Sequence, residues 1–157
     1  MSLTEFDLAL EGLSALGNYE YGSEVHSEGS VDYISGVDTR GGGFSLFFDG
    51  VDVALELQGI PSASGLDYMI NYRGTPLVGH SLGALTANNM VALGAAPSAQ
   101  LYALPIVNFA TGGTSLTVSS GDYVTGYGFE GLINPGSTTI DGPMNEHGAC
   151  YVYNVCY

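Results

Sequence analysis

One serine of this 157-residue chain lies where it could act as a nucleophile. It is Ser81, in the run Gly79-His80-Ser81-Leu82-Gly83, which fits the pattern G-x-S-x-G. The letters alone are weak evidence in a chain with 24 glycines. The match occurs once, however, between an apolar run and a helical pattern, where a serine can project from a sharp turn. The pattern therefore predicts a nucleophile, provided that a base and an acid are supplied elsewhere.

The base that would take the Ser81 proton should be a histidine, and the chain has three. His80 adjoins the serine, but on such a turn we expect its ring to point away from the hydroxyl. His26 lies in a polar N-terminal segment. Where this turn carries a reactive serine, the acid and then the histidine follow it along the chain. Only His147 follows Ser81, so we predict His147 as the base.

The acid that orients this base should follow a strand and precede His147. Asp122 comes just after the strand predicted over 116–120, where a carboxylate can reach an imidazole on a neighbouring loop. We therefore favour Asp122, with Asp141 next. The remaining candidates are Glu130 and Glu146.

The elements around Ser81 have the order that this chemistry needs. The apolar run 75–78 predicts a short strand, and apolar residues then recur at helical spacing over 82–93. Gly94 is a suitable end for that helix. Further strands are predicted over 101–109 and 116–120. Because strands and helices alternate here, the sequence predicts a parallel sheet with helical crossovers.

The N-terminal half is less regular. Capping residues and apolar spacing predict a helix from about residue 4 to Gly17, and a shorter helix over 64–72. Asp49-Gly50 between two apolar runs predicts a β-hairpin, hence an antiparallel strand at one side of the sheet. The glycine run 40–43 is interpreted as a turn. The acidic segment 23–38 lacks the spacing of a calcium loop, so we expect a solvated loop there.

These patterns resemble the α/β-hydrolase superfamily, most closely its lipase and esterase members of the class 3 lipase type. The resemblance covers about residues 51–153 and rests on GHSLG, on Ser-Gly-Asp-Tyr-Val at 120–124 and on His147 followed by Tyr151. Ala84 stands where the family commonly has a glycine. The resemblance implies one domain, residues 1–157, of a compact, reduced α/β-hydrolase type. That domain would have a mixed, mostly parallel sheet flanked by helices and no cap domain.

The same resemblance implies an activity and a site. The activity is hydrolysis of carboxylic esters through an acyl-enzyme, with Ser81, Asp122 and His147 as the catalytic triad. The backbone N–H of Leu82 would form the oxyanion hole, with Ile60 N–H as the second donor. No cofactor or metal is implied. The substrate would be a small ester or lipid.

Composition limits the partners. The formal net charge is −14, with 16 acidic residues against only two arginines and no lysine, so binding to nucleic acid is excluded as a main function. No apolar run is long enough to span a membrane. The N-terminus carries acids where a signal peptide has bases, which favours a cytoplasmic location, although the compartment and the oligomeric state stay open.

The two cysteines, Cys150 and Cys156, are expected to be separate buried thiols. In a strand they would lie too far apart for a disulfide. No close cluster of histidine, cysteine and aspartate predicts a zinc site.

Two alternatives to an ester hydrolase stay open. The chain is short for the fold, so it could keep the serine turn without activity. It could also be a glycine- and tyrosine-rich binding domain in which the serine turn arises by chance. The second alternative predicts mostly antiparallel β-structure and no helix after Ser81.

Overall fold

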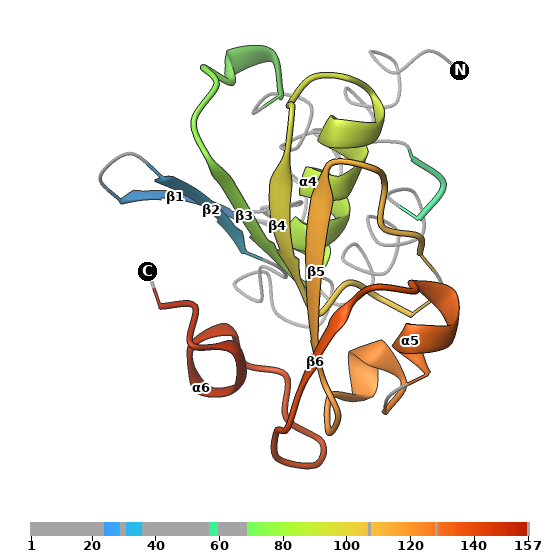
Figure 1. Ribbon diagram of the computed structural model, residues 1–157. Helices are drawn as coiled ribbons and strands as arrows, with labels where there is room; N and C mark the ends of the chain where they lie inside the picture. The colour runs from blue at the N-terminus through green and yellow to red at the C-terminus, as the bar shows by residue number, and fades with distance from the viewer. Residues whose placement is uncertain are drawn as a thin grey trace, which may run out of the picture.

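The computed structural model describes residues 24–28, 31–35, 57–59, 69–106, 108–127 and 129–156. Within them, six strands form one sheet in the order β1-β2-β3-β4-β5-β6 (Figure 1). The strands are β1 (Glu24–Glu28), β2 (Val31–Ser35), β3 (Leu77–His80), β4 (Ala99–Tyr102), β5 (Thr114–Ser119) and β6 (Thr138–Ile140). The other elements are the helices α4 (Leu82–Ala92), α5 (Glu130–Ile133) and α6 (Ala149–Tyr153), and the 3₁₀ turn η1 (Tyr123–Thr125).

The sheet is mixed and mostly parallel, as the sequence predicts. Strands β2 to β6 pair in parallel, and only the edge strand β1 is antiparallel, to β2. Parallel strands end at the same edge of a sheet. The residues that follow β3, β4, β5 and β6 are therefore brought to one edge, although they are far apart in the sequence. This parallel arrangement, with a helix after Ser81, contradicts the fold expected of the antiparallel binding domain.

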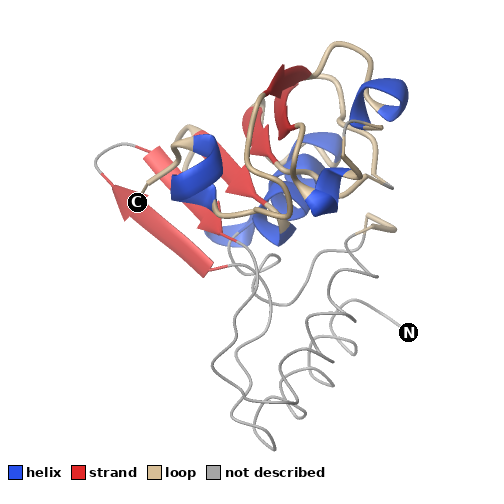
Figure 2. Ribbon diagram, turned by 90° about the horizontal axis from the view of Figure 1, so that it is seen from below, coloured by secondary structure: helices blue, strands red, loops and turns tan. Residues whose placement is uncertain are grey.

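Helices cover both faces of the sheet. Strand residues alternate between the faces, since side chains along a strand point to opposite sides. Leu77 and Leu101 pack with Leu85 of α4 in one apolar cluster. Val78 belongs to a second cluster with Tyr153 of α6. Figure 2 shows α6 beside the strands at the β1–β2 end of the sheet.

Helix α4 forms and ends as its sequence predicts. Its residues from Leu82 to Met90 are all buried, and it packs on β2, β3 and β4. Gly94 takes a φ of 77°, which glycine adopts without steric cost. The next N–H, of Ala95, then bonds to the carbonyl of Met90, so the last carbonyls of the helix are satisfied.

Several expectations need correction. Within the acidic segment 23–38, the described residues 24–28 and 31–35 do not form a solvated loop: they are the antiparallel strands β1 and β2, and β2 lies directly beside β3. The strand expected over 101–109 ends at Tyr102, because Ala103 takes a φ of 52° and leaves the extended conformation. Strand β6 was not predicted at all.

Other expectations fall partly or wholly outside the described residues. The helix from residue 4, the glycine run 40–43 and the hairpin around Asp49-Gly50 lie there. Of the helix expected over 64–72, only residues 69–72 are described; 69–71 are helical and residue 72 is not.

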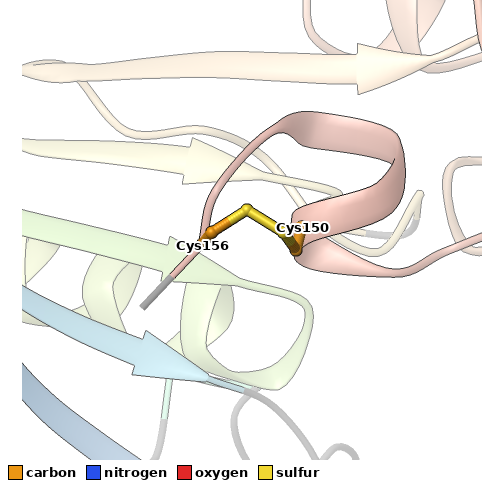
Figure 3. The surroundings of a disulfide bond; sticks show 2 residues. All are labelled: Cys150 and Cys156. Carbon is orange, nitrogen blue, oxygen red and sulfur yellow. A yellow bond between two sulfur atoms is a disulfide. The ribbon is translucent and has the colours of Figure 1, made fainter.

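The expectation of two separate thiols is wrong. Cys150 and Cys156 form a disulfide, with their Cα atoms 4.5 Å apart (Figure 3). The segment is helix α6 rather than a strand, and Asn154 then takes a φ of 56° and turns the chain back. A helical rise of about 1.5 Å per residue, against about 3.3 Å in a strand, makes this approach possible.

Candidate active site

Ser81 occupies the turn between β3 and α4. Its φ of 59° and ψ of −120° are unusual for a residue with a side chain. The turn is fixed to the neighbouring strand, since the Ser81 N–H donates to the Tyr102 carbonyl at 3.1 Å. Its own carbonyl accepts the N–H groups of Ala84 and Leu85 at the start of α4. The residue is partly exposed, so the turn presents the serine at the carboxyl edge of the sheet.

The two flanking glycines are required by close backbone approach. A Cβ on Gly79 would lie 2.5 Å from the Gly83 carbonyl oxygen. A Cβ on Gly83 would lie 1.9 Å from the Ile34 carbonyl oxygen of β2. Both distances are far inside van der Waals contact. The strand can therefore turn sharply into the helix, and β2 can cross its first turn, only because these positions lack a side chain.

The first turn of α4 also provides free backbone donors. Ser81 is the N-cap, and its side chain makes no capping bond. Among the described residues, none accepts a hydrogen bond from the Leu82 N–H. The positive end of the helix dipole and this N–H are thus available to an anion beside Ser81.

The second predicted oxyanion donor, Ile60, lies outside the described residues, so its role stays a prediction. Its described neighbour Gly59 faces the middle of α4: a Cβ there would lie 4.0 Å from the side-chain oxygen of Asn89. By contrast, the backbone that passes against the first turn of α4 is the end of β2, at Ile34.

Asp122 and His147 are paired, as predicted. The His147 Nδ1 lies 2.9 Å from Asp122 Oδ2 and 3.1 Å from Oδ1. Asp122 is fully buried, whereas 18% of the His147 side chain is exposed. The carboxylate can therefore fix the orientation and tautomer of the imidazole, leaving Nε2 to face a reacting group.

The loops that carry this pair pack directly on each other. The Asn145 N–H donates to the Gly121 carbonyl at 2.8 Å. A Cβ on Gly121 would lie 2.2 Å from the Pro143 carbonyl oxygen, and one on Gly142 would lie 2.0 Å from the Ser119 hydroxyl. Glycine at both positions thus allows the loop after β6 to lie against the end of β5, which brings His147 to Asp122.

Tyr153 completes the surroundings of Asp122, and sequence reasoning missed it. From α6 its hydroxyl donates to Asp122 Oδ2, and it accepts the Ser119 N–H at 3.1 Å. The Val124 N–H donates to Oδ1 at 2.8 Å. Burial alone would raise the pKa of Asp122, but the bonds from His147, Tyr153 and Val124 outweigh it and hold the pKa below its usual range. Asp122 is therefore a carboxylate at neutral pH.

No pattern in the sequence distinguishes Tyr153 from its neighbours. The resemblance points instead to Tyr151, which is exposed on the other side of the short helix. Only the packing of α6 on β5 shows which tyrosine reaches the carboxylate.

His80 does not act on Ser81 through a hydrogen bond, and its ring packs toward the other histidine. The centroids of the His80 and His147 rings are 4.6 Å apart. His147 is thus brought to the serine turn. Within the described residues, however, no hydrogen bond joins the Ser81 hydroxyl to the imidazole of His147. Such bonds are often long in enzymes without substrate.

Among the described residues, no hydrogen bond or ion pair joins any of the other acid candidates to His147. Asp141 and Glu146 are exposed. Glu130 is fully buried in α5, where it accepts a hydrogen bond from Asn134. Burial raises the pKa of Glu130, which this bond only partly opposes. The hydrogen bonds around Glu130 stabilise the fold, since the Asn134 amide also donates to the Asn108 carbonyl in the loop after β4.

Exposed apolar side chains lie around His147. The Tyr123 ring centroid is 5.6 Å from that of His147, and Tyr127 bonds to Asn145 in the same loop as His147. Tyr123, Tyr127 and the neighbouring Met144 are all exposed. Tyr123 lies directly beside the imidazole, and Tyr127 and Met144 belong to the loops next to it.

A separate hollow of about 450 Å³ lies at the opposite edge of the sheet, between the starts of β5 and β6. Its lining includes Phe109, Asn134 and Ser137, but none of Ser81, Asp122 or His147. We therefore do not assign it to the candidate site.

The described residues contain no group of three or more histidine, cysteine or acidic side chains placed to hold a metal ion. None of the helices in that part of the chain is long and apolar enough to cross a membrane.

Comparisons with known proteins identify no relative of this chain. No family model, no curated protein and no solved structure matches the chain.

Proposed function

We propose that this chain is a serine hydrolase that cleaves carboxylic esters, on a reduced fold of the α/β-hydrolase type. The observation that carries the proposal is a pairing at one sheet edge. A buried carboxylate, Asp122, holds the ring of His147 beside the strained turn that presents Ser81. Strained backbone and a carboxylate–imidazole pair seldom meet without a chemical role.

In the proposed reaction, His147 Nε2 takes the proton of the Ser81 hydroxyl as its oxygen attacks the ester carbonyl carbon. Asp122 stabilises the imidazolium that forms. The tetrahedral intermediate collapses, the C–O bond to the alcohol breaks, and His147 gives its proton to the leaving alcohol. Water then attacks the acyl-enzyme by the same route and releases the acid.

The oxyanion of the intermediate would be stabilised at the start of α4. The Leu82 N–H is free among the described residues, and the helix dipole adds to it. Ile60 remains the second donor that the family resemblance implies.

The substrate class follows from charge and access. With a net charge of −14, the chain repels anionic substrates and admits neutral or cationic ones. Between Ser81 and His147, where all residues except 107 and 128 are described, the chain forms strands, short helices and loops but no inserted domain. Small or accessible esters therefore fit better than substrates that need a lid.

A fluorophosphonate probe tests the proposal, because it reacts covalently with an activated serine hydroxyl and hardly at all with an ordinary one. We expect the parent to be labelled, with the added mass on the peptide that contains Ser81. Ser81→Ala and His147→Ala should both abolish labelling. Ser115→Ala, at an exposed position at the start of β5, is the control and should be labelled like the parent. Labelling that persists in Ser81→Ala would refute the assignment.

A second candidate is a catalytically inactive protein with the same fold. The missing hydrogen bond between Ser81 and His147 favours it. A folded parent that is neither labelled nor active on an ester panel would support this candidate and exclude the esterase.

A further inference from the structure

His80 has contacts that the proposed reaction does not use. It is the last residue of β3, and only 8% of it is exposed. Alternation along the strand places it on the same face as Val78, toward α6. There its ring centroid lies 4.6 Å from that of His147 and 5.7 Å from that of Tyr153. Its Nε2 lies 2.7 Å from the backbone carbonyl oxygen of His147.

That contact defines the state of the ring. A carbonyl oxygen can only accept a hydrogen bond, so His80 Nε2 must carry the proton and donate it. Burial, and next the charge that His147 can carry, lower the pKa of His80 to about 4. The titratable groups around it are His147, Asp122 and Tyr153, from the loop after β6, the end of β5 and α6. At neutral pH His80 is thus an uncharged donor of fixed tautomer.

His147 is consequently held at two points. Asp122 holds its ring through Nδ1, and His80 holds its backbone through the carbonyl. The other hydrogen bonds of its loop, from the Asn145 N–H to the Gly121 carbonyl and from the Tyr127 hydroxyl to Asn145, tie the loop to the segment after β5 and not to β3. Strand β6 is only three residues long, and residues 143–146 are exposed.

We propose that His80 is a positioning residue that sets the distance between His147 and Ser81 by holding the His147 backbone carbonyl. The inference rests on the proposed function. The geometry supports it because His80 is covalently joined to Ser81. One hydrogen bond therefore ties the loop that carries the base to the strand that carries the nucleophile. A displacement of about 1 Å between such groups can cost about 100-fold in rate.

Two variants separate the donated hydrogen bond from the bulk of the ring. His80→Leu keeps a side chain of similar bulk and loses the donor. His80→Gln keeps a donor, since its amide nitrogen is the same number of bonds from Cα as Nε2 of histidine. With p-nitrophenyl acetate, we expect His80→Leu to lower kcat about 10- to 100-fold with little change in KM, and His80→Gln to restore most of it.

Parent-like kcat in His80→Leu would overturn the proposal. So would an equal loss in both variants at parent-like thermal stability, because bulk rather than the donor would then matter. If His80→Leu does not fold, the glutamine variant decides: near-parent kcat supports the proposal, and a large loss contradicts it.

Hydrogen–deuterium exchange distinguishes failure of the His80 proposal from failure of the proposed esterase function. It needs no activity and is measured on the full-length parent and both variants. We expect faster exchange at the backbone amides of residues 144–148 in His80→Leu than in the parent or in His80→Gln. If the parent is inactive but this difference is found, only the esterase proposal fails. If exchange is the same in all three, His80 does not hold this loop.

Discussion

Replacing Gly83 by alanine tests whether the serine turn is built as the structure has it. The added Cβ would lie 1.9 Å from the Ile34 carbonyl oxygen and 2.5 Å from its carbon. Both are backbone atoms of β2, a strand paired on both sides, so no rotamer change relieves the clash. The backbone must move by more than about 1 Å, since contacts between non-bonded carbon atoms are about 3.5–4.0 Å long.

The magnitude follows from two opposing effects. Overpacking of a core, including the backbone shifts that it forces, costs about 1–3 kcal/mol and occasionally more, and a clash with two backbone atoms lies at or above the upper end of this range. Alanine favours the helix over glycine by about 1 kcal/mol, which offsets part of that cost. We therefore expect Gly83→Ala to lose about 2–3 kcal/mol of unfolding free energy and most of its fluorophosphonate labelling.

Gly131→Ala is the matched control. Gly131 lies in α5, and a Cβ there would meet nothing within 4 Å. The same helix preference should make this variant neutral, or more stable by up to about 1 kcal/mol. Urea unfolding followed by circular dichroism measures both. If Gly83→Ala unfolds like the parent and labels normally, β2 does not cross the first turn of α4, and the reasoning about the turn is wrong.

Three further predictions concern the residues around Asp122. Reduction of the Cys150–Cys156 disulfide, which closes α6, should lower the free energy of unfolding by about 2 kcal/mol, measured as a fall in the denaturation midpoint. A variant in which both cysteines are serine should show no change of midpoint when reductant is added. The pKa of His80 is lowered to about 4, so below about pH 6.5 the unfolded chain binds a proton at His80 that the folded chain does not. The free energy of unfolding should therefore fall by about 3 kcal/mol between pH 6.5 and 4. If it falls equally steeply with pH in His80→Gln, which lacks this group, the explanation is wrong. Tyr153→Phe removes a donor to Asp122, so the pKa of Asp122 should rise and the free energy of unfolding at pH 7 should fall by about 1–3 kcal/mol, a loss that shrinks as Asp122 is protonated at low pH. A variant as stable as the parent at pH 7 would argue against the bond.

Much of the fold around Ser81 could be predicted from the sequence because its signals are local. An apolar run, two glycines and a helical pattern follow one another directly, and each has one dominant physical interpretation. The parallel sheet then follows from alternation of strands and helices. The pairing of Asp122 with His147 was predictable from other signals: Asp122 follows a predicted strand, and His147 is the only histidine after Ser81. That His147 itself follows a strand, β6, could not be read from the sequence.

The segments predicted wrongly depend on contacts between distant parts of the chain. Strand β2 contains Asp32 and lies in an acidic segment, so its composition suggests a loop. It becomes a strand because it pairs with β1 on one side and β3 on the other. The disulfide was missed because the five residues of α6 are too few to show a helical period.

The same limit applies to His80, and it explains why its role was not visible in the sequence. On the pattern G-x-S-x-G, the residue before the serine is a free choice, and its orientation away from the hydroxyl suggests no part in the site. That orientation places the ring on the face of the sheet that packs against α6 and the loop of His147. A donor at position 80 therefore meets the backbone of the residue that carries the base. A residue excluded as the base because of where it points is, for that reason, placed to hold the base.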